Sequence, residues 1–376
     1  MTVISYLTNI RFAPGAVAAL DEDAAELGMS RVLLVTDPGV MAAGIAPDIA
    51  GRLGSRLAAT FADTPSNPTE EATLAALDLY REARCDGIVA VGGGSSLDLA
   101  KAVALLATHP GPIDQYAFIL GGLARITPDV APVIAVPTTA GTGSEVGRAA
   151  LITLRDGRKL GLVSPHLIPR RAVCDPELTL GLPPVLTAAT GMDALTHCIE
   201  TFLSPRDNPP AEAIALDGAA RAWRWLEPAV RDGSDREARR EMMMASLEGG
   251  LTFQKGLGAV HAMSHPLGGI QAPVLHHGTL NAVILPSVLR FNAPAAAAKY
   301  DRLRGVLGLP ADADLAAAVE DLTARLGLPR SLREMGVDPA ILPRMVEGAL
   351  ADHSSVTNPR PVSAADYAAL YDAAMG

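Results

Sequence analysis

The chain is predicted to fold as two domains, an α/β domain with a mainly parallel sheet followed by an all-helical domain. Its 376 residues are more than one hydrophobic core usually supports. Short β-rich runs alternate with amphipathic stretches in the first part, whereas from residue 185 onward long helical patterns dominate and β-type runs are almost absent. Because Pro183 and Pro184 punctuate the chain, we expect domains at 1–182 and 183–376.

The first domain contains recurring strand patterns. Residues 31–36, 57–61, 87–91 and 133–136 read as buried strands, and residues 69–84 show helical periodicity. Such alternation is typical of a parallel sheet with helices on both faces, in which ligands bind beyond the carboxyl ends of the strands. Functional residues are therefore expected directly after strands.

Composition narrows the class of protein. Hydrophobic residues make up 49% and charged residues 19%, which favours a globular enzyme. A net charge of −10 without a basic run argues against nucleic acid or anionic membrane as a partner. Residues 1–6 lack the pattern of an export signal, and no apolar run reaches the roughly 18 residues of a membrane span. The three cysteines share no metal-type spacing, and their odd number argues against a disulfide framework, so a reducing cytoplasm is expected.

A glycine-rich turn, residues 92–98 (GGGSSLD), follows the strand that ends at Val91. Glycines let the backbone approach a phosphate closely, and the amino end of the next helix offers unpaired N–H groups. A tight strand-to-helix turn would need only one glycine, so three glycines followed by two serines favour pyrophosphate binding. The turn lacks the GxGxxG spacing and does not by itself identify the ligand.

Two further loops follow strands. Asp37 could accept hydrogen bonds from the ribose hydroxyls of an adenosine and would repel a 2′-phosphate, although it could equally cap a helix. Residues 137–145 (PTTAGTGSE) are rich in hydroxyls and glycines, which is typical of a ligand-facing loop. Residues 156–159 (DGRK) are predicted to form a hairpin turn.

Histidines gather in the second domain at helical spacing. Asp193 and His197 are four residues apart and would share one face of a helix, as would His261 and His265; residues 276–277 are both histidine. One Asp oxygen with three neutral imidazoles is a plausible ligand set for Fe²⁺, Zn²⁺ or another divalent ion, with a position left for a substrate oxygen. For any single histidine the alternative is a packing role.

Together these motifs resemble the iron-containing (group III) alcohol dehydrogenase family, which shares its fold with glycerol dehydrogenase and dehydroquinate synthase. The resemblance implies a dehydroquinate synthase-like architecture, with an α/β NAD-binding domain and an all-α metal-binding domain. It spans essentially the whole chain. The matching segments are 92–98 with Lys101, 137–145, 175–178, 191–193 with His197, and 260–268.

The resemblance also implies site residues. The metal ligands fall on Asp193, His197, His261 and His277, the histidine that precedes a glycine; many relatives have proline where this chain has His276. The nucleotide contacts fall on Asp37, Gly93, Gly94, Ser95, Ser96, Asp98, Thr138, Thr139, Thr142, Lys159 and Leu178.

The implied activity is metal-dependent NAD(H) alcohol dehydrogenation, with Fe²⁺ as the expected ion and Zn²⁺ or Mn²⁺ as alternatives. Within the family, residues 4–8, 253–258 and 275–282 resemble bacterial 4-hydroxybutyrate dehydrogenases, which implies 4-hydroxybutyrate and succinate semialdehyde as substrates. Alternatives are a related primary-alcohol or diol dehydrogenase, a maleylacetate reductase, a non-redox lyase of the dehydroquinate synthase type, or a non-enzymatic metal-and-nucleotide sensor. A homo-oligomer, dimer or larger, is expected.

Three side chains are candidates for contact with the substrate. His265 lies one helical turn from His261 and is predicted to relay a proton or contact the substrate, the alternative being a supporting role behind the ligands. A substrate carboxylate would need a cation near the metal, and Lys255 and Arg148 are the candidates. The alternative for Lys255 is a solvated lysine at a helix end. With Asp37 at the ribose, NAD is expected to be preferred over NADP.

Overall fold

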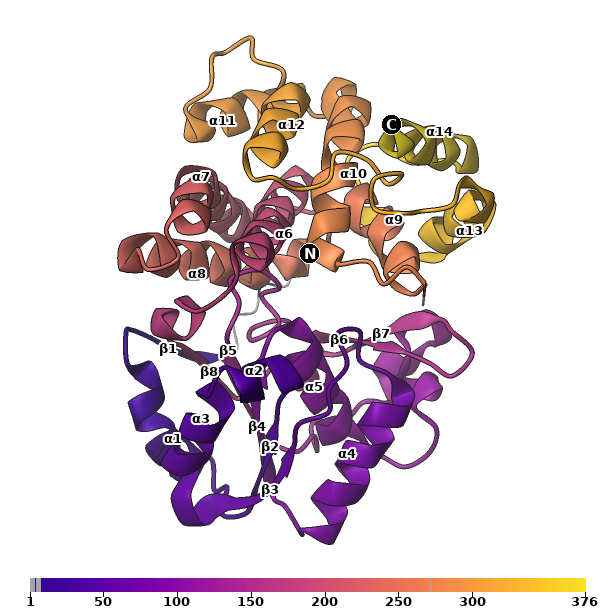
Figure 1. The fold of residues 1–376 in the computed structure, drawn as a ribbon. Helices are drawn as coiled ribbons and strands as arrows, with labels where there is room; N and C mark the ends of the chain where they lie inside the picture. Colours follow the sequence, from indigo (N-terminus) through magenta and orange to yellow (C-terminus); the bar gives the residue numbers. More distant parts are fainter. Residues whose placement is uncertain (1–3, 5–7, 271) are drawn as a thin grey trace. The chain divides into compact units, whose positions relative to one another are not determined.

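The computed structural model describes residue 4, residues 8–270 and residues 272–376 (Figure 1). Two compact units make up the chain: a sheet unit, Tyr6–Thr139 with Ser144–Gly181, and a helical unit, Leu182–Gly376 with the loop Ala140–Gly143. Residues 5–7 of the amino-terminal family motif and Gln271 of the connection before His277 lie outside the described residues.

The sheet unit is built on a six-stranded parallel sheet of order β1-β8-β5-β4-β2-β3. Its strands are β1 Asn9–Phe12, β2 Val32–Val35, β3 Leu57–Phe61, β4 Gly87–Gly92, β5 Val133–Pro137 and β8 Arg171–Cys174. The predicted parallel sheet is confirmed, and each of the four predicted strands is present. Strands β1 and β8 were not predicted; β1 is short and partly exposed, so it carries no clear apolar pattern.

Helices cover both faces of this sheet (Figure 1). They are α1 Leu20–Glu26, α2 Pro38–Ala42, α3 Ile45–Leu53, α4 Glu70–Glu82 and α5 Gly94–Thr108. Alternate residues of one strand enter opposite cores: Leu33 packs in the core with α4 and α5, whereas Leu34 packs in the core with α1 and α3. The predicted turn at 156–159 joins an antiparallel hairpin of β6 Ala149–Thr153 and β7 Lys159–Val163.

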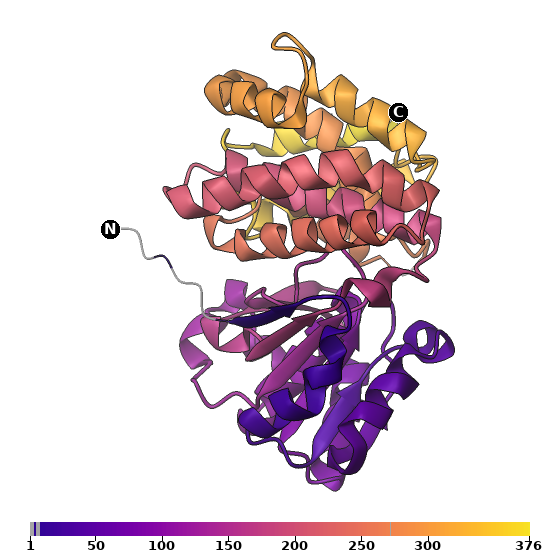
Figure 2. The ribbon, with the colours of Figure 1, turned by 90° about the vertical axis from the view of Figure 1, so that its left-hand side faces the viewer.

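In the helical unit, every regular element among the described residues is a helix. The α-helices are α6 Pro184–Leu203, α7 Pro209–Arg231, α8 Arg236–Leu251, α9 Ala259–Gly268, α10 His277–Asn292, α11 Ala297–Leu307, α12 Leu315–Arg325, α13 Leu342–Ala351 and α14 Ala364–Met375. The long helices coloured magenta to orange run side by side in Figure 2. Helix α6 packs against α7, α8 and α10, and it is buried from Thr187 to its end.

Glycines allow the neighbouring helices to approach α6 closely. A Cβ on Gly191 would lie 2.2 Å from Leu226 Cδ1, and one on Gly218 of α7 would lie 2.7 Å from Cys198 Sγ. A Cβ on Gly249 of α8 would lie 3.1 Å from His197 Cβ. Because α6 carries Asp193 and His197, these close approaches fix the backbone beneath the predicted metal ligands.

Across the described residues, no helix combines the length and the apolar character needed to cross a bilayer.

Candidate metal centre and nucleotide-binding loops

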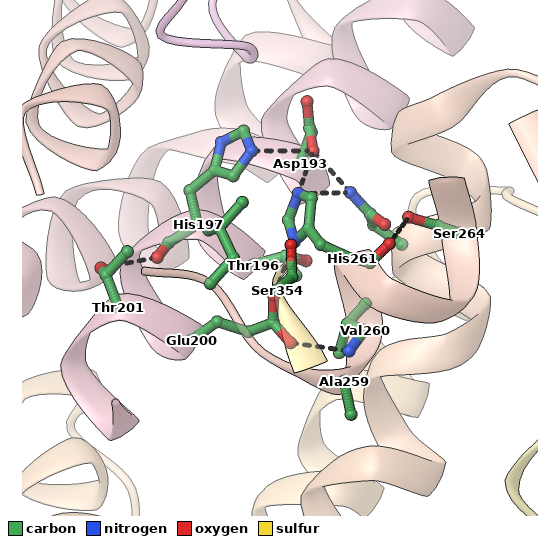
Figure 3. A network of polar contacts seen from close by, with 12 residues as sticks. Asp193, Thr196, His197, Glu200, Thr201, Ala259, Val260, His261, Ser264 and Ser354 are labelled. Atoms are coloured by element: carbon green, nitrogen blue, oxygen red, sulfur yellow. Dashed lines mark hydrogen bonds and ion pairs between the residues drawn. The ribbon is translucent and has the colours of Figure 1, made fainter. Parts of the chain in front are cut away.

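Helix α6 directs a carboxylate and an imidazole toward each other. Asp193 and His197 are 2% and 4% exposed, and His197 Nε2 lies 3.5 Å from Asp193 Oδ1 (Figure 3). Their four-residue spacing places both on one face of the helix, as the sequence indicated.

Two other helices bring further imidazoles to the same oxygen. His261 of α9 and His277 of α10 each place Nε2 3.7 Å from Asp193 Oδ1. The rings of His197 and His261 are stacked with centroids 4.7 Å apart. Helices α6, α9 and α10 thus assemble the four predicted ligands around one point.

This donor set fits a divalent ion. One ligand atom from each of Asp193, His197 and His261 can be chosen so that all lie within 4.8 Å of one another. An ion bound at about 2.0–2.2 Å from each donor fits between atoms at this spacing, and imidazole nitrogen with carboxylate oxygen suits iron, zinc or manganese. His276, by contrast, is the residue that precedes the first turn of α10. His277 is the neighbour whose Nε2 faces Asp193.

Polar groups around the ligands hold their orientation. Asn281, one turn after His277, donates from Nδ2 to Asp193 Oδ1 at 2.7 Å. Glu200 accepts from His261 Nδ1 at 2.6 Å, and the Gly141 carbonyl lies 3.2 Å from His197 Nδ1. Sequence reasoning missed Asn281 and Glu200. Helical spacing could have found both, since Asn281 is four residues from His277 and Glu200 is three from His197.

The electrostatics of the cluster favour positive charge. Burial alone would raise the pKa of Asp193, but His197, His277 and His261 together bring this pKa well below its usual range. Burial lowers the pKa of His197 to about 4. Burial would also lower the pKa of His261, but the neighbouring carboxylates of Asp193 and Glu200 outweigh it and raise this pKa to about 9. A buried carboxylate that remains ionised needs a cation, as a metal centre provides.

His265 lies beside this cluster within a row of rings. It is 6% exposed, and its Nδ1 lies 2.8 Å from Asp352 Oδ2. Its ring stacks on His277 with centroids 5.6 Å apart and on His353 with centroids 5.9 Å apart. His353 is far from the other histidines along the chain, and no sequence pattern predicts that it lies near them.

In the sheet unit, the glycine-rich turn and Asp37 are in contact. Asp37 caps α2 by accepting from the N–H groups of Gly39 and Val40 through Oδ1, and its Oδ2 accepts from Ser96 Oγ at 3.2 Å. Gly92 has φ 152°, and a Cβ there would lie 2.6 Å from Ser96 Oγ. Asp37 therefore does cap a helix, which was the alternative that the sequence left open. Its carboxylate also lies beside the glycine-rich turn.

An unsatisfied hydroxyl faces the same turn. Among the described residues, Thr139 Oγ1 is buried without a hydrogen-bond partner, and Thr138 is 4% exposed. A Cβ on Gly93 would lie 3.5 Å from this hydroxyl, at van der Waals distance, so the hydroxyl lies directly beside the turn. A buried polar atom without a partner is costly. It fits a ligand that supplies hydrogen-bonding groups, as a dinucleotide does.

Several other predicted cofactor contacts have partners within the protein. Asp98 accepts from Ser144 Oγ at 2.5 Å and from the Leu151 N–H at 3.0 Å, which ties α5 to the hairpin. The Asp98 side chain thus has a structural role, and its contact with the cofactor stays a prediction. Lys159 donates to Asn67 Oδ1 at 3.0 Å.

The remaining predicted cofactor contacts are spread over several segments of the chain. Ser95 Oγ donates to the Ser66 carbonyl at 2.5 Å, and Gly94 is the first residue of α5. Leu178 packs against the core formed with α1 and α3. Thr142 belongs to the loop that is grouped with the helical unit.

Lys255, a predicted substrate cation, is enclosed and paired within the protein. Its side chain is fully buried, and Nζ donates to Glu212 Oε1 at 2.7 Å. Lys299 donates to the same oxygen at 3.1 Å. Burial, the largest influence, lowers the pKa of Lys255. An ammonium enclosed and paired in this way joins η8 (Phe253–Lys255) to α7, so the alternative of a solvated helix end is wrong, whereas the substrate contact stays a prediction. Arg148 precedes β6 in the sheet unit, where its carbonyl accepts from the Ser164 N–H at 3.0 Å.

The fold and the candidate metal centre fit a metal-dependent dehydrogenase, and comparison with known families shows that class. Residues 8–176 match the model of the iron-containing alcohol dehydrogenases, and residues 187–375 match the carboxyl-terminal model of the same family. The chain belongs to the iron-containing alcohol dehydrogenase family and is an oxidoreductase.

Individual relatives match over the full length. The chain is 57% identical to a 4-hydroxybutyrate dehydrogenase of Cupriavidus necator, with 100% of each chain covered. It is 38% identical to a 1,3-propanediol dehydrogenase of Klebsiella pneumoniae, with 96% and 95% covered.

Solved structures agree with the fold. A crystal structure of 1,3-propanediol oxidoreductase superimposes with a TM-score of 0.93 at 36% identity, covering 100% of both chains. A sulfoacetaldehyde reductase of Bifidobacterium kashiwanohense in complex with NAD+ gives a TM-score of 0.89 at 29% identity, covering 100% of this chain and 98% of the other. The expected two-domain architecture of the family is confirmed.

Proposed function

We propose that the protein interconverts 4-hydroxybutyrate and succinate semialdehyde by transferring a hydride to or from NAD(H). The observation that carries this proposal is the 57% identity, over the full length of both chains, to a 4-hydroxybutyrate dehydrogenase. A primary-alcohol or diol dehydrogenase is the second candidate, favoured by the 38% identity to a 1,3-propanediol dehydrogenase.

Four side chains hold the metal in this proposal: Asp193, His197, His261 and His277. The Nε2 atoms of the three histidines lie 3.5–3.7 Å from the Oδ1 atom of Asp193, which supports the assignment. Fe²⁺ is the proposed ion, and Zn²⁺ or Mn²⁺ suits the same donors. When bound, a divalent ion supplies Lewis-acid chemistry, which lowers the pKa of an alcohol and polarises a carbonyl.

The protein side chains orient the donors and move the proton. Asn281 fixes the Asp193 carboxylate by its 2.7 Å hydrogen bond. His265 is the proposed group for proton transfer, because Asp352 holds its Nδ1 at 2.8 Å and the ring lies against the proposed ligand His277. An ionised Asp352 only accepts hydrogen bonds, so Nδ1 of His265 carries the proton and Nε2 is left to exchange protons.

NAD is the proposed coenzyme, bound by the loops that follow β2, β4 and β5. The glycine-rich turn at the start of α5 is suited to the pyrophosphate, and the unpartnered Thr139 hydroxyl can contribute a hydrogen bond. Asp37 is placed to disfavour a 2′-phosphate while it caps α2. The structural relative that contains NAD+ supports this choice.

A homo-oligomeric enzyme of the cytoplasm is also proposed, with a domain boundary at 182. Resemblance to the family supports oligomerisation, and three free cysteines are compatible with a reducing compartment. Light scattering on the purified chain measures the assembly: a mass of two or more chains is expected, and a single-chain mass at micromolar concentration would overturn this part.

A substrate screen tests the activity. Metal-loaded protein is mixed with NAD⁺ and, in turn, 4-hydroxybutyrate, 1,3-propanediol and 1-butanol, and NADH is followed at about 340 nm. The highest kcat/KM is expected for 4-hydroxybutyrate. A higher value for 1,3-propanediol or 1-butanol would overturn the substrate while leaving the dehydrogenase class intact, and the absence of net NADH with every alcohol would favour a lyase or a sensor.

A further inference from the structure

We infer that Glu200 is a positioning residue of the metal centre: it holds His261 in the tautomer whose Nε2 is free of a proton, and it anchors the start of α9 to α6. This inference rests on the proposed metal-dependent function. Glu200 is neither a predicted ligand nor a predicted cofactor contact.

Glu200 extends the ligand face of α6 by one turn. It follows Asp193 by seven residues and His197 by three, so all three side chains project from the same side of the helix. Its side chain is buried, with the residue 4% exposed. Oε2 accepts from His261 Nδ1 at 2.6 Å, and Oε1 accepts from the Val260 N–H at 2.7 Å (Figure 3). Both carboxylate oxygens are therefore used, one for a ligand side chain and one for the backbone beside it.

The chemistry of the two partners fixes the tautomer. An ionised carboxylate can only accept hydrogen bonds, so the short contact requires the proton to be on His261 Nδ1. In the neutral ring the lone pair is then on Nε2, the atom that lies 3.7 Å from Asp193 Oδ1. A metal ligand needs that lone pair, and a carboxylate behind the ring also increases its basicity. His197 is held in the same sense, but by the neutral carbonyl of Gly141 at 3.2 Å.

The start of α9 is shaped to admit this carboxylate. A Cβ on Gly258 would lie 2.8 Å from Glu200 Oε1 and 3.0 Å from Asn358 Oδ1. Asn358 Oδ1 accepts from the Ala259 N–H at 3.1 Å, next to the N–H that Glu200 binds. Two acceptors thus anchor adjacent N–H groups of one helix. Only Glu200 also touches a proposed metal ligand, so Asn358 provides a matched control.

The test is the isosteric variant Glu200→Gln. The amide oxygen of glutamine can still accept from the Val260 N–H, but its NH₂ group would then face His261 Nδ1 and would favour the tautomer with the proton on Nε2. We expect the affinity for Zn²⁺ or Co²⁺, measured by competition with a chelator, to fall about 10- to 100-fold. The visible spectrum of the Co²⁺ form should change, and NAD⁺ binding should not.

The control variant Asn358→Ala removes an anchor of α9 without touching His261. It should lower the melting temperature and leave the affinity for Zn²⁺ unchanged. If Asn358→Ala weakened Zn²⁺ binding as much as Glu200→Gln does, or if Glu200→Gln bound Zn²⁺ as tightly as wild type, the inference would be overturned.

A measurement on the wild type does not depend on how the variants fold. In ¹⁵N-histidine NMR of the Zn²⁺-loaded protein, His261 should show a protonated Nδ1 and a metal-bound Nε2. A metal-bound or unprotonated Nδ1 would contradict the role of Glu200. Failure of the wild type to bind any divalent ion would instead overturn the proposed function, so the two failures are distinguishable.

Discussion

The sheet unit and the helical unit use their buried polar side chains differently. In the sheet unit, acidic side chains at the predicted site make internal hydrogen bonds: Asp37 caps α2, and Asp98 ties α5 to the hairpin. In the helical unit, three imidazoles face the single carboxylate of Asp193 at 3.5–3.7 Å. The nucleotide is therefore expected to be held largely by backbone and hydroxyl groups, whereas the metal is expected to be held by side chains alone. Substitutions should accordingly have larger effects in the helical unit.

The largest effect is expected from loss of a metal ligand. His261→Ala removes one of the three imidazoles and should lower metal affinity by at least about 100-fold, more than the loss of an outer partner costs. NADH formation should fall with the metal content. His166→Ala, in the sheet unit, is the control and should retain both. Normal metal content in His261→Ala, measured by elemental analysis, would remove His261 from the ligand set.

A smaller effect on turnover is expected at His265. His265→Gln removes the proposed proton-transfer group, so kcat should fall about 10- to 100-fold, within the range for general acid–base catalysis. Metal content and the KM for NAD⁺ should remain as in wild type, because His265 is not a proposed ligand. A loss of metal equal to the loss of kcat would show instead that His265 only supports His277, against which its ring is stacked.

In the sheet unit, Asp37 is expected to control the choice of coenzyme. Asp37→Ser keeps a side-chain cap for α2 but removes the charge, so a 2′-phosphate no longer meets a carboxylate. The ratio of kcat/KM for NAD⁺ over NADP⁺ should fall at least about tenfold, which corresponds to about 1.4 kcal/mol. Asp37→Gly should relax the preference similarly with a weaker cap. A wild type that already prefers NADP⁺ would show that Asp37 does not lie at the ribose.

The smallest effect on catalysis is expected at Lys255. Lys255→Met breaks its ion pair with Glu212, which keeps Lys299 as a partner, and should lower the free energy of unfolding by about 1–3 kcal/mol. Values of kcat/KM for 4-hydroxybutyrate and 1-butanol should change by the same factor, because the ammonium is enclosed. A loss confined to the acid would return Lys255 to the role of a substrate cation.

Sequence reasoning identified four of the six strands of the parallel sheet and the helical spacing of Asp193 and His197. Residues 87–91 are apolar throughout, and they form all of β4 except its last residue. Asp193 and His197 share a face because their spacing matches the helical period. Strand β1 was missed because an exposed strand of four residues carries no clear pattern.

Long-range partners could not be predicted in the same way. The burial of Lys255 depends on Glu212, which is 43 residues away, and the contact between His265 and His353 depends on how α9 and the segment after α13 pack. Likewise, nothing in residues 92–98 shows that Asp98 turns toward Ser144. Spacing along a helix predicts neighbours within that helix, but pairing between distant segments is decided by tertiary packing.

The most direct test of metal-dependent alcohol oxidation follows activity as metal is restored. Protein is stripped with a chelator, its metal content is verified by elemental analysis, and Fe²⁺ is added back without oxygen in the presence of NAD⁺ and 4-hydroxybutyrate. The donor set predicts that NADH formation is absent in the stripped protein and rises in proportion to bound Fe²⁺, reaching its maximum when every chain holds an ion. Full turnover by protein verified to be metal-free would contradict the account.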